Sequence, residues 1–177
     1  KTDAPYTTPS GYTPSNWYSG YGGLATVRYA ITQSMNVVTT KFFVEDVTPE
    51  LAIEYCEKLG ITTLTDSDYV ESFALGGLTY GVTNLEMTGA YAAIANGGKF
   101  VRPVFYTKVL DRDGNVILDN TNQEGEQVIK ESTAYLLTSA MQDVVTKGTG
   151  TAARLSDGMD AAGKTGTTTD SKDLWFV

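Results

Sequence analysis

Near its carboxyl end the chain places one cation, one glycine and several hydroxyls within five residues, Lys164-Thr165-Gly166-Thr167-Thr168. On a strand, a glycine without a side chain lets a ligand lie flat against the backbone. Lys164, Thr165 and Thr167 would then supply one positive charge and two hydroxyl donors. This chemistry suits a carboxylate or a carbonyl that undergoes acylation. The alternative for these five residues alone is a solvated edge strand whose polar side chains hold no ligand.

The same segment also satisfies a nucleotide-binding pattern, because residues 158–165 read G-x-x-x-x-G-K-S/T. A phosphate loop needs a helix directly after it, so that backbone N–H groups and the helix dipole face the phosphates. Residues 165–170 are instead mostly β-branched residues and glycine, which disfavour a helix interior by roughly 0.5 to 1 kcal/mol each. We therefore expect a strand after Lys164, and nucleotide binding is the weakest alternative.

A second polar candidate, Ser34-Met35-Asn36, interrupts an apolar helical pattern. Thr26 is a candidate helix cap before one apolar run, and the pattern resumes over residues 37–43. Polar side chains between two such runs are positioned rather than packed. Ser and Asn beside a helix break are also common as caps, so this motif alone indicates little.

The composition excludes several classes of chemistry. The chain has no histidine, which removes Ser-His-Asp triads, HExxH zinc sites and imidazole bases. Cys56 is the single cysteine, so we predict a packed thiol, no internal disulfide and no cysteine metal site. The net charge of −8 argues against a nucleic-acid partner. We predict no metal and no cofactor, and acid-base chemistry carried by lysine, carboxylates, tyrosine or the single cysteine.

Caps and turn residues place the helices and strands. Pro49 and Gly60 bound a predicted helix over residues 49–59, and Thr83-Asn-Leu-Glu86 is a capping box that opens another, ended by residues 96–98. Between these helices, residues 62–82 are predicted to be loop. The remaining predicted elements are a hairpin of residues 104–110 and 116–118 with Gly114 at its turn, a helix over 131–146, and strands over 161–168 and 174–177.

This order predicts an α+β fold in which helices pack on an antiparallel sheet. The last predicted strand is apolar and ends in mid-run at Trp175-Phe176-Val177, so the sheet is expected to be incomplete in this chain. No run approaches the roughly 18 apolar residues of a membrane span, and no signal peptide opens the chain.

Taken together, the polar motifs resemble a known set. Ser34-x-Asn36 followed much later by Lys164-Thr165-Gly166 is similar to the motifs of serine-acylating penicillin-binding proteins, whose Ser-x-x-Lys, Ser-Asp-Asn-type and Lys-Thr-Gly set is an established signature. The resemblance covers nearly the whole chain and points to the transpeptidase domain of class A enzymes. Its other segments are Thr13-Pro-Ser-Asn16, Val27-Arg-Tyr-Ala30, Ala74-Leu-Gly76, residues 89–98, Gly148-Thr-Gly150, residues 162–168 and Asp173-Leu-Trp-Phe-Val177.

The resemblance implies a serine β-lactamase/D,D-transpeptidase-like fold and a role for each motif residue. Ser34 would relay a proton, Asn36 would bind the substrate amide and the catalytic lysine, and Lys164 would set the positive field. Thr165 and Thr167 would hold a terminal carboxylate beside Gly166. The implied activity is a D,D-transpeptidase that cross-links peptidoglycan stem peptides ending in D-Ala-D-Ala and is acylated by β-lactam antibiotics, on the extracytoplasmic face of the bacterial membrane.

The chain departs from the family in one respect, because no Ser-x-x-Lys occurs in it. It therefore resembles the carboxyl-side part of one domain, with an approach loop (1–25), a helical part with Ser-x-Asn (26–100) and a hairpin, helix and Lys-Thr-Gly strand (101–177). The remaining segments of that domain would be its partners, and the isolated chain should not acylate. A serine β-lactamase and a catalytically silent sensing or scaffolding relative remain alternatives.

Overall fold

The computed structural model describes residues 1–177, except the side chain of Thr169. The chain forms five α-helices and a set of short strands. A turn of π-helix, Phe43–Val47, continues directly from α2, and short 3₁₀ turns lie at Asp66–Asp68, Glu71–Leu75, Thr151–Ala153 and Thr169–Ser171. The helices are α1 (Val27–Gln33), α2 (Asn36–Phe42), α3 (Pro49–Lys58), α4 (Asn84–Ala95) and α5 (Glu131–Lys147).

All strands pair antiparallel, as two-stranded ribbons within the described residues. With the helices, they confirm the predicted α+β class. The ribbon that carries the lysine motif is β7–β8. The ribbons are β1 (Thr2–Asp3) with β2 (Gly23–Leu24), β3 (Lys99–Phe100) with β6 (Glu126–Gln127), β4 (Lys108–Leu110) with β5 (Val116–Asp119), and β7 (Thr165–Thr167) with β8 (Leu174–Phe176).

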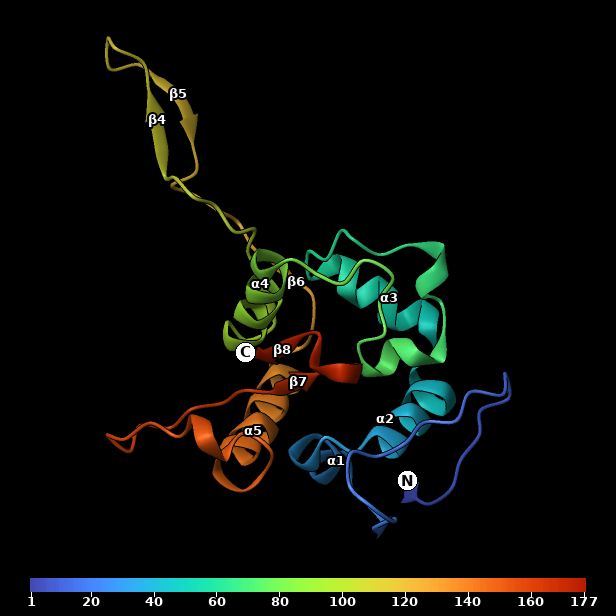
Figure 1. The fold of residues 1–177 in the computed structure, drawn as a ribbon. Helices are drawn as coiled ribbons and strands as arrows, with labels where there is room; N and C mark the ends of the chain where they lie inside the picture. Colours follow the sequence, from blue (N-terminus) through green and yellow to red (C-terminus); the bar gives the residue numbers. More distant parts are fainter.

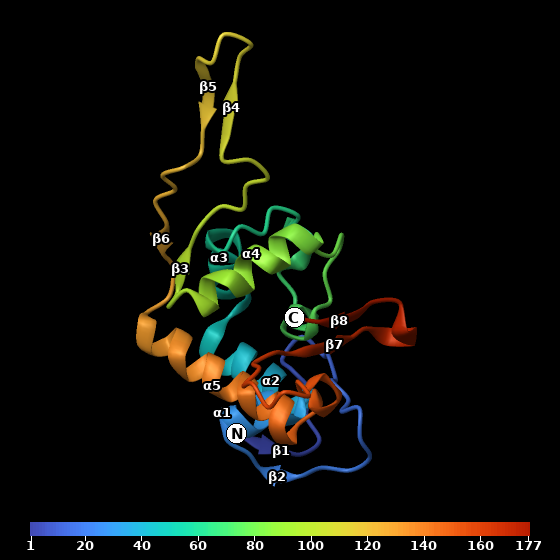
Figure 2. The ribbon, with the colours of Figure 1, turned by 90° about the vertical axis from the view of Figure 1, so that its left-hand side faces the viewer.

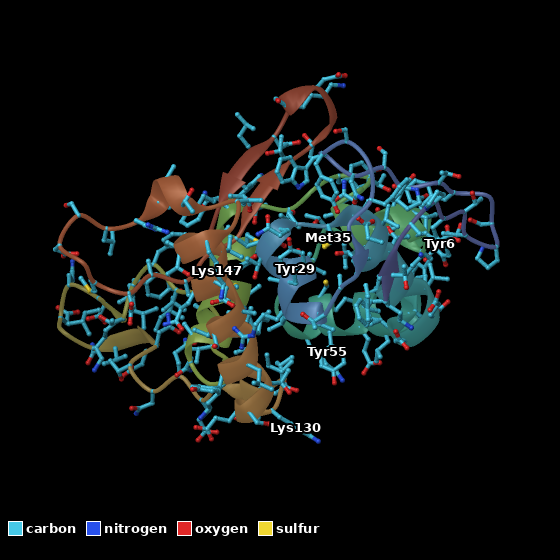
Figure 3. The ribbon with its side chains drawn as sticks, turned by 90° about the horizontal axis from the view of Figure 1, so that it is seen from below. Tyr6, Tyr29, Met35, Tyr55, Lys130 and Lys147 are labelled. Carbon is cyan, nitrogen blue, oxygen red and sulfur yellow. The ribbon has the colours of Figure 1, made fainter. Side chains whose placement is uncertain are left out.

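The helices form the body of the molecule, and the β4–β5 hairpin extends away from it in both views of Figures 1 and 2. The β7–β8 ribbon runs at the level between α4 above it and α5 below it in the same two figures. α1 packs along α5, and Figure 3 shows Tyr29 of α1 beside the end of α5 that carries Lys147. Arg28 links α1 to α5. Its guanidinium donates to the Ser139 carbonyl at 3.0 Å and lies 3.1 Å from the Asp143 carboxylate.

α1, α2 and α5 all contribute buried residues to the interior. Val37, Val38 and Val144 are completely buried, and Ile53 of α3 is nearly so. Burying side chains of this size stabilises the fold by roughly 1.5 to 3 kcal/mol each. The buried faces of α1 and α2 therefore fix the direction of the segment between them, residues 34–35.

Most predicted elements are confirmed, and their bounds differ where tertiary contacts decide them. The capping box forms as expected: the Glu86 amide donates to Thr83 Oγ1 at 3.2 Å, and the Thr83 amide donates back to Glu86 Oε2 at 3.0 Å. The predicted strand over 161–168 was too long, since β7 spans Thr165–Thr167 and its backbone hydrogen bonds to the β8 side extend only to Lys164 and Thr168. A strand, not a helix, therefore follows Lys164, which is the wrong exit for a phosphate loop.

The predicted loop over residues 62–82 is more ordered than its sequence indicated. Its centre is Asp68, a buried carboxylate that accepts hydrogen bonds from the backbone and hydroxyl of both Thr65 and Thr79. These bonds, that from the Thr79 amide foremost, lower the pKa of Asp68. Two 3₁₀ turns form around it. The sequence showed no periodic pattern here because the order comes from one side chain.

Candidate active site

Ser34 and Asn36 lie on a sharp joint between α1 and α2. α1 ends at Ser34 in the left-handed conformation (φ 51°, ψ 50°), and the Met35 amide reaches back to the Ala30 carbonyl at 2.9 Å. Met35 is buried against Ala25, Ala30 and Val38. Because the residue between them faces the core, Ser34 and Asn36 both line the cleft described below.

Lys164 is held at the start of the β7–β8 ribbon. Its backbone exchanges two hydrogen bonds with Val177, at 2.9 and 3.2 Å. Just before it, the backbone of Gly163 packs closely against Phe176: a Cβ at Gly163 would lie 2.5 Å from the Phe176 ring. The end of β8 thus holds the backbone of both Gly163 and Lys164.

The structure brings the lysine and the serine motifs together. Lys164 Nζ donates to Ser34 Oγ at 2.8 Å and to the Thr165 carbonyl at 2.8 Å. Burial lowers the pKa of the Lys164 ammonium, because desolvation disfavours the charged form. A lysine of this kind gives up its proton more readily than a solvated one, and its hydrogen-bond partner is a hydroxyl that could pass the proton on.

All six residues predicted for the site line one cleft of about 800 Å³. Three of the segments that line it are the α1–α2 joint, the β7 strand and the turn around Leu75–Gly76. Asn36 also contacts the approach loop, donating its amide nitrogen to the Ser15 carbonyl at 2.7 Å. Besides those six, the lining includes Trp17, Leu75, Gly76, Tyr91 and Thr149.

Thr149 is a cleft residue that the sequence prediction missed. Its hydroxyl lies 2.7 Å from that of Thr165. The available signal was the Gly148-Thr149-Gly150 segment, which contributed to the family resemblance but was not recognised as part of the site.

Asp3 is connected to the site through Asn16, and the sequence prediction missed it as well. This carboxylate is 1% exposed and accepts hydrogen bonds from Asn16 Nδ2, the Tyr18 hydroxyl and the Gly22 amide at 2.8 to 2.9 Å. Burial alone would raise its pKa, but the three hydrogen bonds outweigh burial and lower it. Asn16 in turn accepts from the Val37 amide at the start of α2. Asp3 therefore reaches the serine-asparagine joint through one intermediate side chain.

The described residues contain no group of three or more histidine, cysteine, aspartate or glutamate side chains arranged to hold a metal ion. Among the helices described, none has the length and apolar character of a membrane span. Cys56 is partly buried, and burial raises the pKa of its thiol.

The fold and the site define a family. The chain belongs to the penicillin-binding protein transpeptidase domain family, whose model matches residues 2–174. Among named relatives, penicillin-binding protein 1A of Clostridium novyi is 39% identical over 90% of this chain, and penicillin-binding protein 1F of Bacillus subtilis is 35% identical over 94% of it. The predicted assignment to a class A transpeptidase domain is thereby confirmed.

Solved structures share the fold. PonA1 of Mycobacterium tuberculosis matches 99% of this chain with a TM-score of 0.83 at 24% identity. The D,D-transpeptidase domain of a peptidoglycan glycosyltransferase from Eggerthella lenta matches with a TM-score of 0.76 at 25% identity, and this chain covers 50% of that structure. The chain spans only 18% and 23% of the two named relatives.

Proposed function

We propose that the chain is part of a peptidoglycan D,D-transpeptidase that works through a serine acyl-enzyme and binds β-lactams covalently. The observation that carries this proposal is the 2.8 Å contact between Lys164 Nζ and Ser34 Oγ in a cleft lined by Thr165 and Thr167. With no histidine in the chain, lysine and serine are the groups available to move a proton.

The nucleophile would come from a Ser-x-x-Lys outside these residues. Its Oγ forms a bond to the carbonyl carbon of the penultimate D-Ala, the peptide bond to the last D-Ala breaks, and the nucleophile's proton passes to the leaving amine. Ser34, hydrogen-bonded to Lys164, would relay that proton. An acceptor amine then bonds to the same carbonyl carbon, the ester bond to the serine breaks, and the proton lost by the amine returns to the serine oxygen, which completes the cross-link.

Thr167 would stabilise the negative charge that develops on the carbonyl oxygen. Lys164 exchanges both of its backbone hydrogen bonds with Val177, and the Thr168 amide donates to the Asp173 carbonyl. Because an antiparallel ladder alternates, the Thr167 N–H between these positions faces the open edge of β7 rather than β8. One such oxyanion donor is typically worth about 3 kcal/mol.

The neighbours in structure support the β-lactam part of the proposal. PonA1 of M. tuberculosis is described in complex with penicillin V, and penicillin-binding protein A of the same organism as an imipenem acyl-enzyme. By the same family likeness, the parent would act outside the cytoplasmic membrane on stem peptides ending in D-Ala-D-Ala.

Intact-mass measurement after incubation with benzylpenicillin tests the proposal. We expect an adduct on the parent protein that contains this chain, and none on residues 1–177 alone. An unmodified parent would contradict the acyl-enzyme and favour a silent relative. An adduct that hydrolyses within seconds would indicate a β-lactamase instead.

A further inference from the structure

Thr149 joins the two halves of the cleft. Its amide donates to the Thr32 carbonyl in α1 at 3.3 Å, and its hydroxyl lies 2.7 Å from Thr165 Oγ1 in β7. α1 leads into the joint that carries Ser34, and β7 follows Lys164. Thr149 therefore touches both segments that bring the lysine and the serine together.

The glycines on either side leave the Thr149 backbone little freedom. A Cβ at Gly148 would overlap the Thr32 carbonyl oxygen, and one at Gly150 would lie 3.2 Å from Val144 and 3.3 Å from Phe176. The Gly150 amide is also bonded to the Val144 carbonyl at 3.0 Å. The backbone of residues 148–150 packs against α1, α5 and β8. These contacts hold Thr149 in the position where its hydroxyl meets Thr165.

Only one of the two hydroxyls can donate in the hydrogen bond between Thr149 and Thr165. Which of them donates decides whether the Thr165 proton is free for a ligand. The geometry permits either oxygen to be the donor. A carboxylate ligand is only an acceptor, so Thr165 can bind it only by donating its own proton. Thr165 Oγ1 must then accept from Thr149.

We propose that Thr149 is a positioning residue for anionic ligands, whose hydroxyl donates to Thr165 so that the Thr165 hydroxyl points its proton at a ligand carboxylate. This inference rests on the proposed function and deepens it. The one-way chain from Thr149 through Thr165 to the ligand polarises each bond in turn. Its benefit should be greatest for a charged acceptor, because charge-assisted hydrogen bonds are the stronger ones.

The experiment compares two acylating agents on the parent protein, benzylpenicillin with its free carboxylate and benzylpenicillin methyl ester without it. We expect T149V to lower the second-order acylation rate constant for benzylpenicillin about tenfold, the effect of one hydrogen bond. The rate with the ester should change less than about twofold. T149S, which keeps the hydroxyl, should restore the wild-type ratio of the two rates.

T146V is the matched control, because Thr146 is an exposed threonine on α5 whose hydroxyl donates to the Gln142 carbonyl of the same helix at 3.0 Å. Equal losses with both agents, or a T149V that matches T146V, would overturn the inference. So would thermal unfolding showing that neither T149V nor the smaller T149A folds, since Thr149 would then be a packing residue. If the wild-type parent is not acylated at all, it is the proposed function that fails.

Discussion

The cleft and the β4–β5 hairpin differ in what surrounds them. Around the cleft, glycines sit where a Cβ would collide, as at Gly148 and Gly163, and Asp3 is buried among three donors. In the hairpin, Gly114 has open space around it and the whole of β5 is exposed. The hairpin is held by its own turn, in which Asp111 accepts from the Asp113 and Asn115 amides. The cleft depends on contacts between distant segments, whereas the hairpin depends on neighbours in sequence.

Removing the charge in the cleft should have the largest effect. We expect K164A to lower the rate of benzylpenicillin acylation of the parent at least a hundredfold, in the range of losing a preorganised electrostatic group. K147A is the control, because Lys147 is an exposed cation on α5 that pairs with Asp143 at 3.2 Å. Stopped-flow or mass-based acylation rates measure both. Similar rates for the two variants would refute the role of Lys164.

Glycine substitutions contrast the two regions directly. G148A should destabilise the parent by at least about 2 kcal/mol, since the new methyl must push α1 away. It should also slow acylation by moving Ser34 relative to Lys164. G114A has room for its methyl but a φ of 86°, so we expect a loss of only about 1 kcal/mol.

Urea unfolding of the parent gives the stabilities, and acylation rates give the function. If G148A acylated at the wild-type rate, Gly148 would not couple α1 to the cleft.

Asp3 near the cleft and Asp119 in the hairpin both have lowered pKa values, so they allow the two regions to be compared. D3N should destabilise the parent by about 2 kcal/mol at neutral pH, because hydrogen bonds to a buried charge are among the strong ones. Since the folded state lowers the pKa of Asp3, its contribution is present above the unfolded pKa and is lost as pH falls through the folded one. The wild-type advantage over D3N should therefore shrink in acid.

Asp119 provides the exposed counterpart. Hydrogen bonds from Thr121, and then from Lys108, hold its pKa at about 2, yet the side chain lies on the surface of the hairpin. We expect D119N to leave the melting temperature of the parent unchanged, because exposed ion pairs contribute little. Melting curves at pH 7 and pH 3 measure both variants, and a D119N loss as large as that of D3N would contradict the distinction.

Shortening the hairpin should have the smallest effect. The Asn120 amide donates to the Thr107 carbonyl at 2.7 Å, so residues 108–119 can be replaced by a two-residue Asn-Gly turn. We expect acylation of the parent to stay within about twofold of wild type, as for surface changes far from a site. A larger loss would show that the hairpin contributes to the cleft.

The same contrast explains what the sequence could predict. Local signals located α3, α4, α5 and the hairpin, because capping boxes, proline, glycine and helical spacing act within a few residues. The resemblance selected Ser34, Asn36 and Lys164, and the structure places them in one cleft. Their individual roles stay predictions.

What the sequence did not reveal depends on distant partners. Asp3 lies in a segment rich in turn residues, and nothing nearby indicates that Asn16, Tyr18 and Gly22 converge on it. Thr149 is one of many threonines until β7 is folded against it. The bounds of β7 were also wrong, because the predicted strand included residues 161–163, whereas the first backbone hydrogen bonds to β8 are those between Lys164 and Val177.

The left-handed backbone at Ser34 sets stability and catalysis against each other. A residue with a Cβ costs roughly 1 to 2 kcal/mol in this conformation, and glycine costs almost nothing. S34G should therefore relieve the backbone while it deletes the hydroxyl that Lys164 contacts. Selection for stability alone would favour glycine here, so the serine is the kind of residue a protein keeps only where activity outweighs stability. Libraries screened for thermostability should enrich glycine at position 34, and libraries screened for acylation should purge it.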